Sequence, residues 1–246
     1  MKLILISLIV FFTSCEKQDS ANASLVGNPL PTTVLDSTPK SPPGTFSYLA
    51  LGDSYTVGYG VFSEQSFPRQ LVDSLEIKGL KSNFIKVIAG AGWTTRDLID
   101  NINRERLTRT FDVVTLLIGV NNQYRNFNEN LYRTEFAELL TTAIMLARGD
   151  KSKVFVLSIP DWGVTPYAKT FSSGNTGIIT QQINQYNVIN KEESEKRFVT
   201  YIDVTPISRQ AANDLTLLAS DDLHPSGKMY NLWVRLLAPK VFTQLK

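Results

Sequence analysis

From residue 46 onward, short apolar runs alternate with segments in which apolar residues recur at helical spacing. Runs of this length, apolar at nearly every position, are typical of strands buried on both faces of a parallel sheet. The clearest helical segment extends from Leu131 to Ala147, where apolar side chains line one side. The five predicted strands are Phe46–Leu51, Phe84–Ala89, Val113–Ile118, Val154–Ile159 and Val199–Val204.

This alternation restricts the fold to one class. Successive parallel strands are joined by right-handed crossovers, which place helices on both faces of the sheet. A length of about 200 residues is ordinary for a single domain of this kind. We therefore predict an α/β fold over residues 46–246, a three-layer α/β/α sandwich with a five-stranded parallel sheet.

The N-terminus follows a different pattern. One lysine precedes the apolar run Leu3–Phe12, which is too short to span a bilayer because a helix needs about 20 residues to do so. A positive residue, a short apolar run and small residues are typical of a signal peptide. Phe12-Thr13-Ser14-Cys15 resembles a bacterial lipobox, in which the cysteine carries the lipid. We expect a lipoprotein-type signal peptide over residues 1–15, with an ordinary signal peptide and a chance cysteine as the alternative.

Residues 16–45 are predicted to be a linker. The segment is small and polar at first and then rich in proline, so it cannot bury enough apolar surface to fold. Together with the lipobox, it predicts an exported protein of the cell envelope, held on a bacterial membrane by a lipid on Cys15. The linker would then hold the folded domain away from the bilayer.

Composition excludes several classes of function. The chain has 25 Lys and Arg against 23 Asp and Glu, a net charge of +2, and no Lys/Arg-rich stripe. Nucleic acid is not an expected partner, because phosphate binding needs clustered positive charge. One histidine and one cysteine cannot form a His or Cys metal centre, and one cysteine cannot form an intramolecular disulfide. We expect no metal and no cofactor, and the oligomeric state stays open.

Candidate chemistry gathers where the predicted strands end. In an open parallel sheet, ligands bind beyond the carboxyl ends of the strands. The first strand is followed by Gly52-Asp53-Ser54, and the next three by Gly90–Trp93, Gly119–Asn122 and Pro160–Gly163. The single histidine, His224, precedes the last predicted helix. We therefore expect these segments to meet at one edge of the sheet.

Three of these residues can perform nucleophilic catalysis. Ser54 lies on a strand-to-helix turn, and a serine hydroxyl needs a base to take its proton. His224 is the one imidazole in the chain, and an acceptor must hold it in the right tautomer. Asp221, three residues earlier, can fold back onto the ring. Asp222 is the competing candidate, although its two-residue spacing makes that return harder.

An acyl-transfer site also needs donors for the oxyanion. The backbone amides of Ser54 and Gly92 and the side chain of Asn121 are the candidates. Taken alone, each motif also has a plain structural interpretation, as a turn, a loop cap or a helix-capping ion pair. The residues expected to contact substrate are Tyr55, Trp93, Asn122 and Trp162. Trp162, with the nearby Tyr167, can instead pack the loop that follows the fourth strand.

Together these segments resemble the SGNH/GDSL hydrolases, esterases and lipases named for their serine, glycine, asparagine and histidine positions. Ser54 in Gly-Asp-Ser-Tyr, Gly92, Asn121 in Gly-Val-Asn-Asn and His224 in Asp-Asp-Leu-His follow the family's block order. Asn122 stands where Asp is usual. The resemblance covers residues 46–246 and implies a flavodoxin-like strand order and serine esterase chemistry without a metal.

The expected function is a serine esterase or lipase-type hydrolase that works through an acyl-enzyme intermediate. Expected substrates are a short-chain acyl ester or an O-acetylated carbohydrate. Two alternatives stay open: a lysophospholipase or thioesterase-type acylhydrolase, and a non-catalytic surface lipoprotein that binds a glycan in the same crevice.

Overall fold

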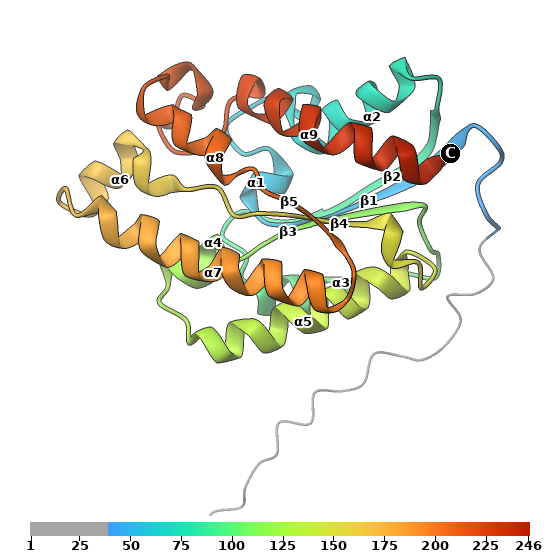
Figure 1. The fold of residues 1–246 in the computed structure, drawn as a ribbon, viewed down its shortest axis with the longest axis horizontal. Coiled ribbons are helices and arrows are strands. Elements are labelled where there is room, and N and C mark those ends of the chain that lie inside the picture. The colour runs from blue at the N-terminus through green and yellow to red at the C-terminus, as the bar shows by residue number, and fades with distance from the viewer. Residues whose placement is uncertain (1–38) are drawn as a thin grey trace, which may run out of the picture. The chain divides into compact units, whose positions relative to one another are not determined.

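A computed structural model describes residues 39–246, which form a five-stranded, all-parallel sheet in the order β2-β1-β3-β4-β5 (Figure 1). This order is flavodoxin-like, as the family resemblance implied. The strands are β1 (Thr45–Gly52), β2 (Lys81–Ala89), β3 (Val113–Leu117), β4 (Val154–Leu157) and β5 (Thr200–Ile202).

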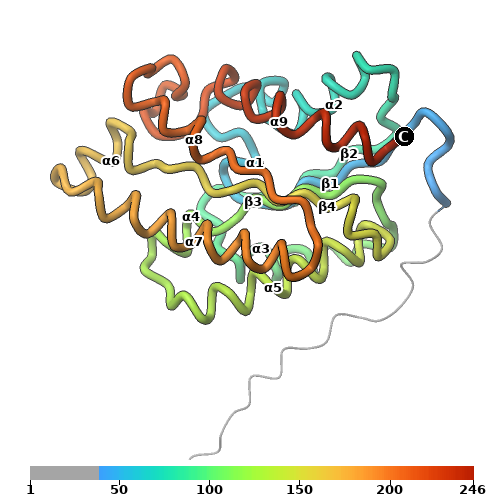
Figure 2. The backbone as a smooth tube through the Cα atoms, viewed as in Figure 1, coloured from blue at the N-terminus to red at the C-terminus, as the bar shows by residue number. Residues whose placement is uncertain are grey.

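Helices cover both faces of the sheet, which confirms the three-layer sandwich (Figures 1 and 2). One face is covered by α2 (Phe67–Ile77) and α9 (Gly227–Leu245). The other is covered by α3 (Thr95–Glu105), α5 (Glu129–Leu146) and α7 (Thr176–Lys196). The short elements are α1 (Ser54–Val57), α4 (Val120–Tyr124), α6 (Pro166–Phe171), α8 (Thr205–Ser208) and the 3₁₀ turns η1 (Ser63–Gln65), η2 (Lys151–Lys153), η3 (Trp162–Val164), η4 (Arg209–Ala212) and η5 (Leu215–Leu217).

The predicted strands are found, with shifted ends. β2 begins three residues before the apolar run, because it is an edge strand and its first residues are polar and largely exposed. β4 ends at Leu157, since the next residue, Ser158, uses its hydroxyl to accept hydrogen bonds from the backbone of Val204 and Thr205. The Ser158 backbone N–H still donates to the carbonyl of Ile202 at 3.0 Å, so this is the last residue at which the two segments are joined through their backbones.

The central strands are held by burial on both faces. Every residue of β3 and β4 is buried, as expected of strands between two helical layers. On the face covered by α2 and α9, the largest fully buried side chain is Trp233. Its ring packs against those of Tyr230 and Phe67, at 5.0 and 6.3 Å between centroids. Aromatic burial of this size fixes α9 to the sheet and places the segment before α9 at the sheet's carboxyl edge.

The last residues of the predicted linker are attached to the domain. The carbonyl of Pro39 accepts a hydrogen bond from Arg148, and the Ser41 hydroxyl donates to the carboxylate of Asp112. The predicted signal peptide, Cys15 and the rest of the linker lie outside the described residues. Within residues 39–246, no helix is long and apolar enough to cross a membrane.

Candidate active site

The carboxyl ends of the strands surround a pocket with a volume of about 250 Å³. Six of the predicted site residues line it, from five separate segments: those after β1, β2, β3 and β4 and the one before α9. The lining residues are Ser54, Tyr55, Tyr59, Ala91, Gly92, Val120, Asn121, Tyr124, Trp162, Tyr167, Leu223 and His224. The residues that the sequence places at strand ends thus share one cavity.

Ser54 is held in the lining of the pocket by a tight strand-to-helix turn. The Asp53 side chain accepts a hydrogen bond from the Tyr55 backbone at 3.0 Å and caps α1, whose first residue is Ser54. Gly52 must lack a side chain here, because a Cβ would lie 2.1 Å from the Thr56 hydroxyl oxygen. This close approach lets the chain turn directly from β1 into α1 and leaves Ser54 only 6% exposed.

His224 lies between Ser54 and Asp221. Its Nε2 is 3.1 Å from Ser54 Oγ, and its Nδ1 is 2.6 Å from Asp221 Oδ2. The other Asp221 oxygen accepts from the backbone N–H groups of Leu223 and His224 at 3.1 and 2.9 Å. Asp222 is exposed, with φ +57°, and Asp221 is the carboxylate that contacts the ring. The loop therefore fixes both the position and the tautomer of the imidazole.

The two aspartates near Ser54 are in opposite electrostatic states. Burial raises the pKa of Asp221, but hydrogen bonds from the backbone and ring of His224 and from Leu223 outweigh it, so the pKa is below its ordinary value. Burial dominates at Asp53 and raises its pKa to about 8, despite hydrogen bonds from the backbone of Tyr55 and Gly119. At neutral pH the carboxylate is therefore at Asp221, beside His224, and Asp53 is largely neutral.

Gly92 and Asn121 approach the pocket from the next two strand ends. Gly92 has φ +79°, a left-handed conformation that favours glycine. Its carbonyl accepts a hydrogen bond from Arg125 at 2.9 Å. Asn121 Nδ2 donates to the carbonyl of Trp93 at 2.9 Å. Because an amide nitrogen carries two protons, Asn121 retains one that can be donated to a group in the pocket.

Two of the predicted substrate contacts do not line the pocket. Asn122 was expected to contact substrate, but its side chain is fully buried and both amide atoms bond Thr95. Trp93 is not among the lining residues either. Its indole lies over Gly90, where a Cβ would come within 2.2 Å of the ring. The other two predicted contacts, Tyr55 and Trp162, do line the pocket.

One wall of the pocket is aromatic. Trp162 packs against Tyr124 and Tyr167, with ring centroids 5.8 and 6.3 Å apart. Its indole N–H donates to Gln123 Oε1 at 2.8 Å, so the polar edge of the ring is satisfied by protein. Tyr124 was missed by sequence reasoning, because nothing in its surroundings distinguishes it from other exposed tyrosines before α4 is placed. The same holds for Tyr59, whose ring lies 4.8 Å from that of His224.

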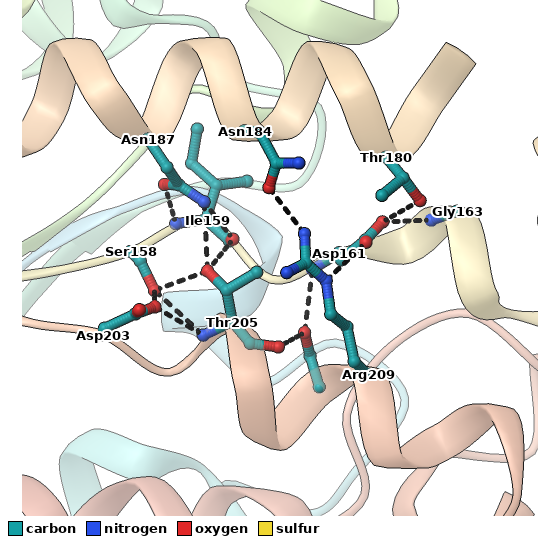
Figure 3. A network of polar contacts seen from close by, with 11 residues as sticks. Ser158, Ile159, Asp161, Gly163, Thr180, Asn184, Asn187, Asp203, Thr205 and Arg209 are labelled. Carbon is teal, nitrogen blue, oxygen red and sulfur yellow. Dashed lines mark hydrogen bonds and ion pairs between the residues drawn. The ribbon is translucent and has the colours of Figure 1, made fainter. Parts of the chain in front are cut away.

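A buried polar network fixes the loop that carries Trp162 (Figure 3). Asp161 accepts hydrogen bonds from Gly163 N–H at 2.9 Å, from the Thr180 hydroxyl at 3.2 Å and from Arg209 Nε at 2.9 Å. The carboxylate is fully buried and is neutralised by Arg209. Because a buried charge requires such partners, the loop has little freedom to move away from them.

Within residues 39–246, no group of three or more His, Cys, Asp or Glu side chains is arranged to hold a metal ion. The pocket offers instead a hydroxyl, an imidazole backed by a carboxylate, and amide donors on neighbouring strand ends. This set can perform acyl transfer: a nucleophile, a base and a place for negative charge.

Comparison with solved structures shows the same fold. TesA matches with a TM-score of 0.62 and 14% identity, covering 80% of this chain and 99% of TesA. The lipase/acylhydrolase from Enterococcus faecalis matches with a TM-score of 0.62 and 21% identity, over 81% and 97% of the two chains. An acetyl xylan esterase from Geobacillus stearothermophilus matches with a TM-score of 0.57 and 16% identity, over 80% and 94%.

No curated protein matches the chain. Residues 50–232 match the GDSL-like Lipase/Acylhydrolase family. This range begins within β1 and includes every segment that lines the pocket. The chain therefore belongs to the GDSL-like lipase/acylhydrolase family of hydrolases.

Proposed function

We propose that the chain hydrolyses carboxylic esters, with Ser54 as nucleophile, His224 as general base and Asp221 as the residue that orients the imidazole. The observation that carries the proposal is the hydrogen-bonded line from Ser54 Oγ through His224 to Asp221, with distances of 3.1 and 2.6 Å, at the wall of a pocket. Serine, histidine and carboxylate in this geometry form a triad whatever their order along the chain.

The reaction follows from these positions. Ser54 Oγ attacks the ester carbonyl carbon while His224 Nε2 takes the hydroxyl proton. The tetrahedral intermediate collapses, the bond to the alcohol oxygen breaks, and His224 returns the proton to that oxygen. Water then attacks the acyl-serine, His224 accepts one of its protons, and the acid leaves as the proton passes back to Ser54 Oγ. Asp221 stabilises the imidazolium in both halves.

Negative charge on the intermediate requires donors, which the pocket supplies. We assign this role to the backbone N–H groups of Ser54 and Gly92 and to Asn121 Nδ2. All three residues line the pocket, and each follows a different strand of the sheet. Donors fixed on a folded scaffold stabilise the oxyanion without a reorganisation cost during the reaction.

The walls of the pocket favour an uncharged substrate. Apart from His224, its lining consists of apolar, aromatic and amide or hydroxyl side chains, with no Lys, Arg, Asp or Glu among the described residues that line it. A short-chain acyl ester fits this chemistry. An O-acetylated carbohydrate is the second candidate, because the half-exposed rings of Tyr59 and Tyr167 can stack on a sugar. Phosphate-bearing substrates of lysophospholipases and thioesterases would find no cation in the pocket wall.

The proposal is tested with Ser54→Ala and the matched control Ser63→Ala, an exposed serine on η1. Ser54→Ala should abolish hydrolysis of a small activated ester and labelling by a fluorophosphonate, while its thermal melt stays that of the parent. Ser63→Ala should behave as the parent in all three assays. Turnover retained in Ser54→Ala contradicts the assignment.

The non-catalytic alternative makes the opposite prediction. A surface protein that holds a glycan in this crevice would bind the same ligand in the parent and in Ser54→Ala, and a fluorophosphonate would not label it. Stoichiometric labelling at Ser54 excludes that alternative. A series of acyl esters then separates the enzyme candidates, since a steep preference for acetate favours a carbohydrate esterase and a preference for long chains favours a lipase.

We further propose, from the sequence, that the protein is exported and attached to a bacterial membrane through a lipid on Cys15. Cys15 lies outside the described residues, so the lipobox resemblance alone supports this. Membrane fractions from cells that express Cys15→Ser should lose the protein, and an unchanged membrane fraction contradicts the anchor.

A further inference from the structure

The turn that carries Gly92 is tied to α4 and α5 by a line of buried polar side chains. Thr95, the first residue of α3, is fully buried, and so is Asn122 of α4. Glu135 of α5 is 3% exposed. Three helices, α3, α4 and α5, therefore meet at side chains that water barely reaches.

The hydrogen bonds in this line have a fixed direction. The Thr95 backbone N–H donates to Asn122 Oδ1 at 3.0 Å, and because this N–H can only donate, the amide oxygen must face it. Asn122 Nδ2 then donates to Thr95 Oγ1 at 2.7 Å. A hydroxyl that accepts there has one proton left to give, and Thr95 donates it to Glu135.

Glu135 completes the line as an acceptor. Its second oxygen accepts from Arg96 Nε at 3.0 Å, and Arg96 Nη2 lies 3.0 Å from the same oxygen. An ionised carboxylate only accepts, so Glu135 needs the Thr95 proton for its remaining oxygen. The amide at position 122 and the carboxylate at position 135 are therefore matched through Thr95. The amide donates a hydrogen bond to the Thr95 hydroxyl, and the carboxylate accepts one from it.

A carboxylate at position 122 would break this match. In Asn122→Asp, two acceptors compete for the single hydroxyl proton of Thr95, and one of them loses its donor. Because the cluster is buried, water cannot replace that donor, and the two negative charges repel. The aspartate that the family resemblance leads one to expect at this position does not fit a chain that has Glu135.

The cluster lies directly behind the two donors assigned to the oxyanion. Only Trp93 and Thr94 separate Gly92 from Thr95, and Asn121 directly precedes Asn122. Asn121 also donates to the carbonyl of Trp93, which joins the two donors on the pocket side. A change in the contact between Thr95 and Asn122 would therefore move both donors relative to Ser54.

We propose that Asn122 is a positioning residue for the reaction, which acts through Thr95 and is matched to Glu135. It sets the Gly92 N–H and Asn121 at the distance from Ser54 that the transition state requires. This inference rests on the proposed function, because an oxyanion forms only if Ser54 attacks an acyl group or its analogue.

The test is an exchange of the amide and the carboxylate. Asn122→Asp should lower kcat about 10- to 100-fold and leave KM within about 2-fold, because small displacements of catalytic groups cost turnover rather than binding. Combining Asn122→Asp with Glu135→Gln should restore most of kcat. In the combined variant, the new amide at 135 donates to Thr95 Oγ1, and the Thr95 proton goes to the new carboxylate at 122.

A second pair of variants tests the same inference even if the protein does not fold with Asn122→Asp. Thr95→Ser keeps the hydroxyl and should retain kcat, whereas Thr95→Val keeps the shape, removes the hydroxyl and should lower kcat at unchanged KM. Thermal melts show how much of each variant is folded. If kcat per folded molecule is the same in all variants, the cluster only stabilises the fold and the positioning role is overturned.

Fluorophosphonate labelling separates this inference from the proposed function. Labelling of Ser54 by a fluorophosphonate requires the same oxyanion donors but no ester. Its second-order rate constant should therefore fall in Asn122→Asp and recover in the combined variant, as kcat does. A parent protein that is labelled but hydrolyses no ester would contradict the proposed function, while the labelling rates would still test Asn122. A combined variant that is labelled no faster than Asn122→Asp overturns the positioning role.

Discussion

His224 Nε2 lies 3.1 Å from Ser54 Oγ, although 170 residues separate the two along the chain. The fold brings them together, because Ser54 follows β1, the second strand in the order of the sheet, and His224 lies in the segment before α9, at the same carboxyl edge. No other imidazole exists in the sequence to replace His224.

His224→Ala should therefore lower kcat by about 10⁴-fold or more, since Ser54 loses its base and nothing nearby can take over. Added imidazole should restore part of the activity by entering the space left by the ring. The measurement is ester hydrolysis with and without imidazole. Substantial turnover in the unsupplemented variant would contradict the assignment of His224 as base.

The two neighbouring aspartates should respond differently to the same change. Asp221→Asn removes the carboxylate that contacts His224 Nδ1 and should lower kcat by about 10⁴-fold, because the amide favours the wrong tautomer. Asp222→Asn alters an exposed side chain and should leave kcat within about 2-fold of the parent. Steady-state kinetics of the two variants at neutral pH checks the prediction, and equal losses would refute it.

Asn121→Ala should lower kcat about 10²- to 10³-fold with little change in KM, because in the proposed reaction its amide binds the oxyanion of the transition state more strongly than the bound substrate. Asn103→Ala, at an exposed position of α3, is the matched control and should have no effect. The comparison uses kcat and KM for one activated ester. A rise in KM alone would assign Asn121 to substrate binding instead.

Asp53 should make the protein less stable as pH rises. Its pKa is 3.8 as a free side chain and about 8 in the fold, so its contribution is fully present below about pH 4 and is lost as pH rises through about 8. Asp53→Asn cannot ionise and keeps an oxygen for the Tyr55 N–H. Its free energy of unfolding should exceed that of the parent at pH 8, by up to about 1.4 kcal/mol per pH unit crossed, and match it near pH 4.

Asp221 should have the opposite effect on how the free energy of unfolding depends on pH. Its pKa is lowered in the fold, so the stability it contributes is present above pH 4 and is lost as pH falls through the lowered value. Urea unfolding of the parent, Asp53→Asn and Asp221→Asn at several pH values measures how the free energy of unfolding depends on each aspartate. Parallel curves for the parent and Asp53→Asn would show that Asp53 is ionised in the fold.

Much of the fold was predictable from the sequence, because buried parallel strands are apolar at nearly every position. That signal weakens at the sheet edge, where the polar start of β2 at Lys81 was missed. The order of strand ends could also be inferred, which is why Ser54, Gly92, Asn121 and His224 were expected in one place. Spacing along the chain alone could not decide whether Asp221 or Asp222 contacts His224. In the structure the backbone is left-handed at Asp222, and Asp221 is the carboxylate that faces the ring.

The pocket walls were less predictable, since they depend on which way side chains point from short helices. Asn122 and Asn121 are adjacent on α4, yet one is buried against Thr95 and the other lines the pocket. Tyr59 lies in the turn after α1 and Tyr124 on the five-residue α4, and neither segment is long enough to have a period. Residue type does not reveal such orientations, because they follow from tertiary packing.

The loop that carries Trp162 belongs to the strand end after β4, whereas Ser54, Gly92 and Asn121 follow β1, β2 and β3. Trp162 and Tyr167 of the aromatic wall therefore lie on a separate stretch of chain from the residues proposed to break the ester bond. Substitutions or length changes between β4 and α7 can then give a descendant of this protein a new substrate while its reaction stays as it was. Specificity and chemistry can evolve here independently.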